Sequence, residues 1–343
     1  MIKTIALSGG GTGGHIFPLL SLYNFLKEEE NYRFIWMGEE FSLEEKIAQK
    51  NQIKFLSLST GKLRRYFDLK NFYEPLKNMT GVIQALYYIK KYNIDIIFSK
   101  GGYVSVPVCI AAKILGKKIY IHESDTVTGL SNKFISKFAT KIFYSFPHPL
   151  IDGQKHILSG QILNPELIDN IESIEKEENE TLHILVIAGS QGSTIIFKSL
   201  LSLLDNLQDI DFTIILGEKN LHFRENFSRF SNVTLYDFIS QEELGQVYKD
   251  TDIAITRAGA TTLFELYYFG IHSIIIPLKS SAGHHQEKNA QFFKKSFSSD
   301  VLDEDEDLSN ALLELLQKYK DLRKVGLNIE NFFEPLNIIK KYL

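Results

Sequence analysis

A glycine-rich turn near the start of the chain carries the clearest chemical signal. Residues 9–14 read Gly-Gly-Gly-Thr-Gly-Gly, and His15 follows them. Glycines between a strand and a helix let the backbone approach a ligand closely and point its amides at an anion. We therefore expect a phosphate, diphosphate or sugar at this turn. His15 is a candidate general base, because an imidazole with a pKa of about 6.5 accepts protons at neutral pH; alternatively, it only orients the turn.

Two further glycine turns lie in the second half of the chain. Residues 188–193 read Ala-Gly-Ser-Gln-Gly-Ser, and residues 256–265 read Thr-Arg-Ala-Gly-Ala-Thr-Thr-Leu-Phe-Glu. Backbone amides at a helix start suit a diphosphate, although 188–193 could also be an ordinary strand–helix turn. Glu265 is a candidate ribose ligand, because a carboxylate accepts two hydrogen bonds from adjacent hydroxyl groups.

A fourth polar cluster, Gly-His-His-Gln-Glu-Lys-Asn-Ala, occupies residues 283–290. Its two adjacent histidines would point about 100° apart on a helix, which disfavours a shared metal ion. The acidic groups at 250–252 precede a predicted strand, and those at 303–305 belong to an acidic run. We therefore expect no metal ion and no other cofactor, and we interpret 283–290 as a polar wall for sugar hydroxyls.

Strands and helices alternate along the chain and must position these turns. Predicted strands in the first half are 2–8, 33–37, 53–58, 95–99, 118–122 and 141–144. Predicted strands in the second half are 182–188, 212–216, 233–236, 253–256 and 273–277. Predicted helices include 15–30, 104–115, 192–205 and 260–269. Such alternation indicates parallel sheets with helical crossovers, because parallel neighbours cannot be joined by a tight turn.

The two series predict two α/β domains. Residues 164–180 contain seven acidic side chains and read as a solvated linker. We expect domains at 1–160 and 165–326, each doubly wound, facing each other across a cleft. The apolar spacing in 327–343 is helical, with Pro335 kinking or restarting the helix. This helix could pack on either domain.

Composition narrows the class of protein. The 343 residues are 44% hydrophobic and carry a net charge of −4, which is typical of a globular protein and argues against a general nucleic-acid binder. The single cysteine, Cys109, excludes an internal disulfide framework and favours a cytoplasmic compartment. The longest run without Asp, Glu, Lys or Arg, 4–26, is interrupted by glycines and His15, so we expect no membrane-spanning helix and no signal peptide.

Several motifs occur in the order found in the MurG family of N-acetylglucosaminyltransferases, which this sequence resembles over about residues 5–295. The matching segments are 10–15 (GGTGGH), 100–107 (KGGYVSVP), 121–125 (IHESD), 129–132 (GLSN), 189–192 (GSQG), 257–260 (RAGA) and 285–290 (HQEKNA). The resemblance implies the GT-B fold, two Rossmann-like domains around a cleft. It also implies inverting transfer of GlcNAc from UDP-GlcNAc to the 4-hydroxyl of MurNAc in undecaprenyl-diphosphate-MurNAc-pentapeptide, which converts lipid I to lipid II at the cytoplasmic side of the cell membrane.

The resemblance also assigns roles to individual residues. The donor ligands it implies are Ser190 and Gln191 at the diphosphate and sugar, Ile239 at the uracil, Glu265 at the ribose and Gln286 at the GlcNAc hydroxyls. Independently of the resemblance, we expect the helix that opens at Gly259 and Ala260 to direct its positive end toward the diphosphate. The residues the resemblance places nearest the reacting centre are Thr12, Gly13, Gly14 and His15. Independently of the resemblance, Asp125 and Glu123 are rival bases, because both follow the end of a predicted strand at the same face. One departure is Asn164, which stands where the family commonly has an arginine that contacts the nucleotide.

A basic segment suggests how a lipid-linked acceptor is reached. Residues 62–92 contain seven basic side chains against two acidic ones, interleaved with aromatic and aliphatic residues. Such a composition attaches proteins to an anionic membrane surface. Alternatively, the segment is a solvated loop before a core helix whose stripe Met79, Ile83 and Leu86 is buried.

Three other functions stay open at this point. Gly9, Gly11 and Gly14 satisfy the dinucleotide-binding pattern, with Glu39 as the possible ribose ligand, which would fit a nicotinamide or flavin enzyme. A related GT-B transferase could use another lipid acceptor, such as diacylglycerol. Asn164 raises the possibility of a degenerate protein that only binds a sugar nucleotide.

Overall fold

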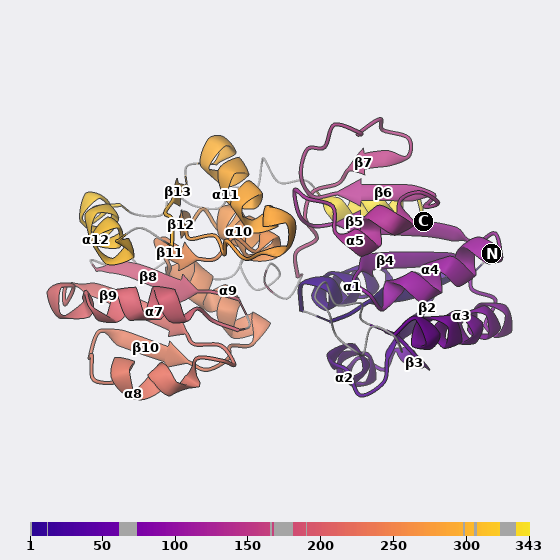
Figure 1. The fold of residues 1–343 in the computed structure, drawn as a ribbon, viewed down its shortest axis with the longest axis horizontal. Helices are drawn as coiled ribbons and strands as arrows, with labels where there is room; N and C mark the ends of the chain where they lie inside the picture. Colours follow the sequence, from indigo (N-terminus) through magenta and orange to yellow (C-terminus); the bar gives the residue numbers. More distant parts are fainter. Residues whose placement is uncertain are drawn as a thin grey trace. The chain divides into compact units, whose positions relative to one another are not determined.

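The chain forms two compact units, each built around its own parallel sheet (Figure 1). The structure, a computed structural model, describes residues 2–11, 13–61, 74–164, 167, 181–189, 191–297, 299–304, 307–322 and 334–343. Two predicted site residues, Thr12 and Ser190, lie outside these residues, as does most of the basic and acidic segments at 62–73 and 165–180. The first unit is Met1–Asn164 with Phe333–Leu343, and the second is Pro165–Phe332.

The first unit holds a seven-stranded sheet in the order β3-β2-β1-β4-β5-β6-β7, with every neighbouring pair parallel. Its strands are β1 Lys3–Gly9, β2 Tyr32–Glu39, β3 Lys54–Leu58, β4 Ile96–Gly101, β5 Lys118–Glu123, β6 Lys141–Tyr144 and β7 His156–Leu158. Its helices are α1 Gly13–Leu26, α2 Leu43–Lys50, α3 Glu74–Lys91, α4 Ser105–Ile114, α5 Leu130–Ile135 and α13 Pro335–Lys340.

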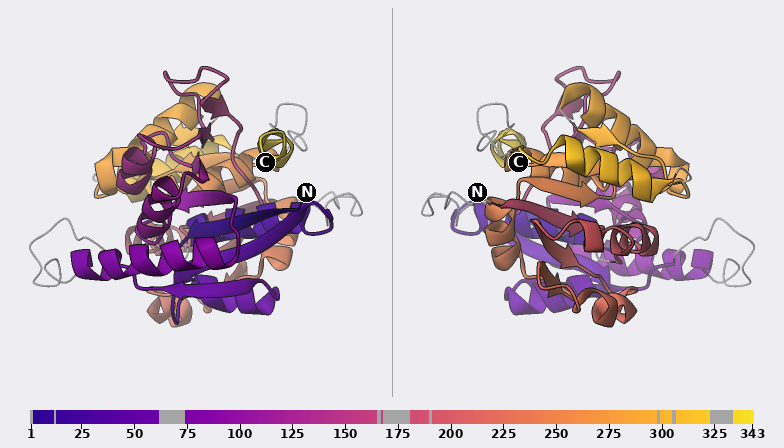
Figure 2. Two further views of the ribbon diagram at one scale, coloured as in Figure 1. Left: turned by 90° about the vertical axis from the view of Figure 1, so that its right-hand side faces the viewer. Right: turned by 90° about the vertical axis from the view of Figure 1, so that its left-hand side faces the viewer.

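Helices cover both faces of this sheet, as Figure 2 shows from two sides. Along β1, Ile5 and Leu7 belong to a core shared with α1, α2 and α13, whereas Ala6 belongs to a core shared with α3, α4 and α5. Successive side chains of a strand point to opposite faces, so a strand buried on both sides must be apolar throughout. This requirement explains why the predicted strands read as continuous apolar runs.

The second unit holds a six-stranded parallel sheet in the order β10-β9-β8-β11-β12-β13. Its strands are β8 Leu182–Ile187, β9 Ile210–Ile215, β10 Val233–Tyr236, β11 Ile253–Thr256, β12 His272–Ile275 and β13 Asp300–Val301. Its α-helices are α7 Thr194–Leu201, α8 Arg224–Phe227, α9 Gln241–Asp250, α10 Ala260–Tyr268, α11 His285–Ser296 and α12 Leu308–Lys318.

The predicted α/β fold with two doubly wound sheets is confirmed, and all eleven predicted strands are present. Two strands were not predicted: β7 has three residues and β13 has two, too few for a period-two pattern to emerge. Helix α7 ends at Leu201 rather than at 205, where a 3-10 turn at Leu204–Asn206 follows.

Helix α3 corrects the interpretation of its apolar stripe as core. Met79 and Ile83 are 63% and 67% exposed, and only Leu86 packs partly against the core. The buried residues in the middle and last turns of α3 are Gly81, Ala85 and Ile89, and this helix packs beside α4. Small residues let the two helices approach closely, so the larger apolar side chains stand on the opposite face. Among the described helices, none is both long and apolar enough to cross a bilayer.

The end of the chain packs on the first unit. Pro335 occupies the first turn of α13, where its missing N–H costs no hydrogen bond. Ile339 and Leu343 are buried in the core on the α1 side of the sheet. The Lys3 ammonium donates to the Leu343 carbonyl at 2.5 Å, and the Tyr120 hydroxyl donates to the Tyr342 carbonyl at 2.8 Å. The terminal segment therefore closes the core of the N-terminal sheet.

We expect Ile339→Ala to destabilise the first unit by roughly 2–4 kcal/mol, because it leaves a cavity beside β1. The single tryptophan, Trp36, is fully buried in β2 of that unit, so its fluorescence reports the unfolding of the first unit. Lys341→Ala, at an exposed position of the same segment, is the control and should leave the urea midpoint unchanged. Equal midpoints for all three proteins would contradict the docking described here.

Candidate functional site

The glycine turns lie at the edge of each sheet where the strands end. In the first unit, β1 and β4 are neighbours at the point where the strand order reverses. The turn after β1 leads into His15, the turn after β4 contains Gly102, and Glu123 ends the next strand, β5. Crevices at such a switch point are the usual ligand sites of doubly wound sheets. Gly13, Gly14, His15, Glu123 and Asp125 are thus brought to one edge of one sheet.

His15 is held in one tautomer by the glycine turn. Its Nδ1 lies 3.0 Å from the Gly10 carbonyl, which can only accept, so Nδ1 carries the hydrogen and Nε2 keeps its lone pair. Desolvation lowers the pKa of His15, and the nearby Lys100 charge lowers it further. Gly102 packs against this arrangement: with φ +80°, a Cβ there would lie 2.8 Å from the Gly10 oxygen. His15 therefore presents a neutral, unprotonated Nε2.

A buried lysine lies near the end of β4, close to His15 and Glu123. Lys100 is 2% exposed, and its ammonium donates to His122 Nδ1 at 2.5 Å and to the Ser124 hydroxyl. His122 Nε2 donates in turn to the Gly160 carbonyl at 3.0 Å, which keeps the His122 ring neutral. Burial lowers the pKa of Lys100 to about 7, against the opposing effect of Glu123 and Asp125. The ammonium thus ties β4 to the loop after β5.

Lys100 received no role from the sequence, although one signal was available. A charged residue two positions after the apolar run 96–98 of a buried strand is rarely accidental, since isolated burial of a charge is costly.

The two rival bases differ in their surroundings. Glu123 is buried, and its carboxylate accepts from the Asp125 amide at 3.2 Å, the Gly129 amide at 3.0 Å and the Asn132 side chain at 3.0 Å. Burial raises the pKa of Glu123, and the Asp125 charge raises it further. Three donors on one carboxylate fix the loop 125–129. Asp125 is half-buried at the start of this loop and favours the charged form of His15.

Glu39, the acidic residue of the dinucleotide hypothesis, is already engaged. The Tyr103 hydroxyl donates to Glu39 Oε2 at 2.5 Å, and burial raises the pKa of Tyr103 above its ordinary value, so this hydroxyl keeps its proton as a donor. Glu44, which the sequence did not single out, is 2% exposed beside the same turn and accepts from the Glu39 amide at 3.4 Å. Glu44 and Tyr103 lie directly beside Gly10 and Gly11 of this turn.

In the second unit, the turns after β8 and β11 are adjacent for the same topological reason. Gly192 has φ +72°, and a Cβ there would lie 1.9 Å from the Leu216 carbonyl, so only glycine fits. Asn220 fastens the turn: its amide donates to the Gln191 carbonyl at 2.7 Å and its carbonyl accepts from Thr194 at 2.8 Å. At the start of α7, the Ser193 hydroxyl is buried and has no hydrogen-bond partner among the described residues.

Glu265 is placed as predicted, in α10, the helix that begins at Ala260 after Gly259. It is buried, and the Tyr248 hydroxyl donates to its Oε2 at 2.9 Å. Burial raises the pKa of Glu265 to about 7, while the Tyr248 hydrogen bond lowers it. Tyr248, on α9, is a contact that the sequence gave no reason to expect, because the two residues come from different helices.

The remaining predicted donor residues line the same edge of the second sheet. Gln286 lies in the first turn of α11 and accepts from the Leu278 amide at 2.9 Å, which leaves its NH₂ group as a donor. Ile239 is half-buried between β10 and α9. Arg257, from the turn after β11, forms an ion pair with Glu304 at 2.7 Å and donates to the Ile276 carbonyl. Its charge is thus used to fix the turn. Asn164 is buried at the end of the first unit.

Comparisons with known proteins show the family of this chain. Residues 5–144 match the glycosyltransferase family 28 N-terminal domain, and residues 183–334 match the glycosyltransferase family 28 C-terminal domain. Proteins of Clostridium kluyveri and Clostridium botulinum (strain Langeland) are 36% and 37% identical over 99% of this chain and 100% and 99% of their own lengths. Both bear the name UDP-N-acetylglucosamine–N-acetylmuramyl-(pentapeptide) pyrophosphoryl-undecaprenol N-acetylglucosamine transferase.

Solved structures share the fold. MurG of Acinetobacter baumannii superimposes with a TM-score of 0.77 at 21% identity, covering 99% of this chain and 98% of its own. A UDP-GlcNAc 2-epimerase of Neisseria meningitidis, bound to UDP-GlcNAc, gives 0.69 at 12% identity, with 100% and 99% covered. At these identities, the likeness shows the GT-B-like fold alone.

The buried Glu265 carboxyl predicts a pH-dependent stability difference. Its pKa is about 7 in the folded protein and 4.5 in its ordinary state, so the folded protein binds this proton more tightly and loses stability as the pH rises from about 4.5 to 7. Glu265→Gln removes this loss while keeping an acceptor for Tyr248. We expect the variant to be more stable by roughly 3 kcal/mol at pH 8 and equal to the wild type at pH 4.5, by calorimetry. Equal stability at pH 8 would contradict the raised pKa of the buried Glu265 carboxyl.

Proposed function

Because this chain belongs to the MurG members of glycosyltransferase family 28, we propose how its residues divide the work of that family's reaction. The enzyme is an N-acetylglucosamine transferase that acts on lipid I and forms lipid II in peptidoglycan synthesis. Family membership excludes the oxidoreductase considered above. We assign residues below to donor binding, to acceptor binding and to the proton transfer.

We assign the donor, UDP-GlcNAc, to the second unit. Helices α7 and α10 begin beside each other at the switch point, and their N-terminal amides suit a diphosphate. The unpartnered Ser193 hydroxyl at the start of α7 supports this assignment, since a buried hydroxyl is normally hydrogen-bonded. Gln191 and Ser190 would lie at the diphosphate and sugar.

The other donor contacts follow from the same edge of the sheet. Glu265 would accept from the ribose hydroxyls with the oxygen that Tyr248 leaves open, and Gln286 would donate to the GlcNAc hydroxyls. Ile239 would cover the uracil. Gly259 and Ala260 would bring the start of α10 close to the diphosphate.

We assign the acceptor and the proton transfer to the first unit. Inverting transfer is a single displacement at the anomeric carbon, which needs a base at the 4-hydroxyl of MurNAc. His15 is our base, because its Nδ1–H bond to Gly10 leaves Nε2 unprotonated; this is the observation that carries the proposal. The Glu123 carboxylate already accepts three hydrogen bonds, so its role in our proposal is to hold the loop 125–129 in place. Asp125 would orient His15, and Thr12, Gly13 and Gly14 would border the acceptor.

The departing UDP would be stabilised by backbone dipoles without a divalent ion. The acidic groups that a metal would need are committed elsewhere: Asp252 accepts from the His183 amide at the opposite edge of the sheet, Asp303 pairs with Lys279, and Glu304 pairs with Arg257. Each helix N-terminus carries about half a positive charge, which two adjacent helices apply to one diphosphate.

We further propose that α3 attaches the enzyme to the cytoplasmic side of the membrane. Leu76, Met79, Ile83 and Tyr87 are 61%, 63%, 67% and 56% exposed and follow one face of the helix at helical spacing. Lys90 and Lys91 end that helix. The other basic and aromatic residues of the predicted segment, at 62–73, lie outside the described residues. An apolar helix face next to cations is typical of peripheral attachment to anionic lipid.

A crossed pair of variants tests the division of roles. Purified enzyme is incubated with UDP-GlcNAc and a lipid I analogue in detergent, with and without EDTA, and UDP release is followed. We expect His15→Gln to lower kcat by about 100-fold or more with little change in the KM for UDP-GlcNAc. Glu265→Ala should raise that KM at least about ten-fold, through the lost ribose contacts. An active His15→Gln enzyme would move the base role to Asp125.

The attachment is tested with Met79→Ser/Ile83→Ser. We expect this variant to bind vesicles of phosphatidylglycerol and phosphatidylcholine at least about ten-fold more weakly, because two exposed apolar side chains are lost. Its kcat on a short-chain acceptor in detergent should not change. Leu150→Ser, at a 57% exposed position away from α3, is the matched control and should bind the vesicles as the wild type does. Equal binding by all three proteins would exclude α3.

A further inference from the structure

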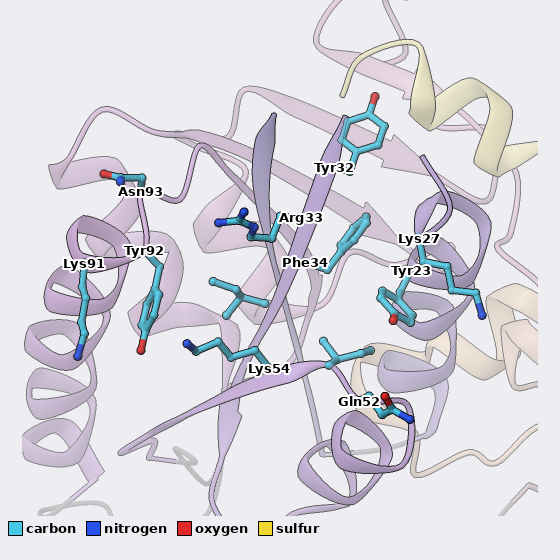
Figure 3. Close-up of a pocket in the computed structure, with 12 residues that line it drawn as sticks. Tyr23, Lys27, Tyr32, Arg33, Phe34, Gln52, Lys54, Lys91, Tyr92 and Asn93 are labelled. Atoms are coloured by element: carbon cyan, nitrogen blue, oxygen red, sulfur yellow. The ribbon is translucent and has the colours of Figure 1, made fainter. Parts of the chain in front are cut away.

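A cavity of about 450 Å³ opens in the first unit at the edge of the sheet where the strands begin. The starts of β2 and β3 form its floor, and Lys27, Gln52 and Asn93, which follow α1, α2 and α3, stand around it (Figure 3). Strand β2 has eight residues, so the cavity lies roughly 20 Å or more from the edge that carries His15. The cavity is therefore separate from the site of the transfer reaction.

The lining of the cavity is cationic. Lys27, Arg33, Lys54 and Lys91 line it, and its lining contains no aspartate or glutamate. All four side chains are exposed, and none forms an ion pair within the part of the chain that the structure describes. Four like charges around one cavity repel each other unless an anion lies between them.

An aromatic ring separates two of these cations. The Lys54 ammonium lies 4.1 Å from the centre of the Tyr92 ring, and the Lys91 ammonium lies 5.6 Å from it. Figure 3 shows the Tyr92 ring between the two lysines. The ring attracts each cation but does not neutralise either. Tyr23 and Tyr32 add further aromatic surface to the lining.

Helix dipoles neutralise only part of the positive charge of the four cations. Three helices end at the cavity, and each C-terminus carries about half a negative charge. A net positive charge of about 2.5 therefore remains at the cavity, and this charge attracts an anionic ligand.

We propose that this cavity binds a dianionic phosphate group, such as a phosphomonoester or a diphosphate, with Arg33 and Lys54 as its principal ligands. Arg33 offers a forked pair of donors, and Lys54 offers a point charge held against Tyr92. Such a phosphate comes either from a free metabolite or from a lipid headgroup. The lipid source rests on the membrane attachment proposed above, since Lys91 lies 5.1 Å from the ring of Tyr87 on the exposed face of α3; the free source does not.

The test compares Arg33→Gln/Lys54→Gln with Lys113→Gln/Lys137→Gln, which removes two exposed charges of the same unit outside the cavity. Pyrophosphate binding to the full chain is measured by calorimetry with UDP at saturation, so that the proposed donor site of the second unit is occupied. Binding to vesicles of phosphatidic acid and phosphatidylcholine is measured in parallel. Trp36 fluorescence confirms that each variant is folded.

We expect the cavity variant to lose at least about ten-fold in affinity while the control stays within about two-fold of the wild type. Loss of pyrophosphate binding identifies a free phosphate as the ligand. Loss confined to the vesicles identifies a lipid headgroup. An equal loss in both variants, or no loss in either assay, overturns the proposal. Because neither variant alters Met79 or Ile83, failure here leaves the α3 attachment to be judged by its own test.

Discussion

The close approach of two backbones at the end of the N-terminal sheet is the constraint on which the proposed chemistry depends. Gly10 and Gly102 come so near that a single added carbon would touch the Gly10 oxygen. That same oxygen accepts the His15 Nδ1 hydrogen and so determines which nitrogen can take a proton. A side chain at position 102 would displace the carbonyl and release the ring. The glycines thus serve the orientation of an imidazole as well as access to a ligand.

Several buried ionisable groups lie where the strands of the two sheets end. Lys100, His122 and Glu123 share the first edge, and Glu265 lies alone with Tyr248 at the second. Each loses hydration on folding, and hydrogen bonds restore only part of that loss. Such groups are retained at a cost in stability, which is consistent with sites that act on ligands. At the second edge, ribose hydroxyls would supply donors to the open oxygen of Glu265 that the folded chain does not.

The sequence was sufficient to predict the two α/β sheets, because the sheets are parallel and buried on both faces. Apolar runs such as 96–98 in β4 and 253–255 in β11 are strong signals when every residue of a strand must be apolar. The shared edge of the glycine turns follows from strand order alone. Short strands such as β13 were missed, since two residues carry no period. The exposure of Met79 and Ile83 was also missed, because helical spacing does not say which face meets the core.

Contacts between distant elements lay beyond the sequence. Tyr248 meets Glu265 from another helix, and the Lys100 ammonium reaches His122 from the neighbouring strand. Sequence periodicity predicts the helix or strand to which a residue belongs. It does not predict how one element is rotated against another, because packing decides that rotation. The basic cavity is of the same kind: Lys27, Arg33, Lys54 and Lys91 are spread over more than sixty positions and meet only because three helices end at one edge. In a parallel sheet all strands begin on one side and end on the other. Loops where the strands end can evolve for catalysis, while loops where the strands begin stay free to bind a different ligand.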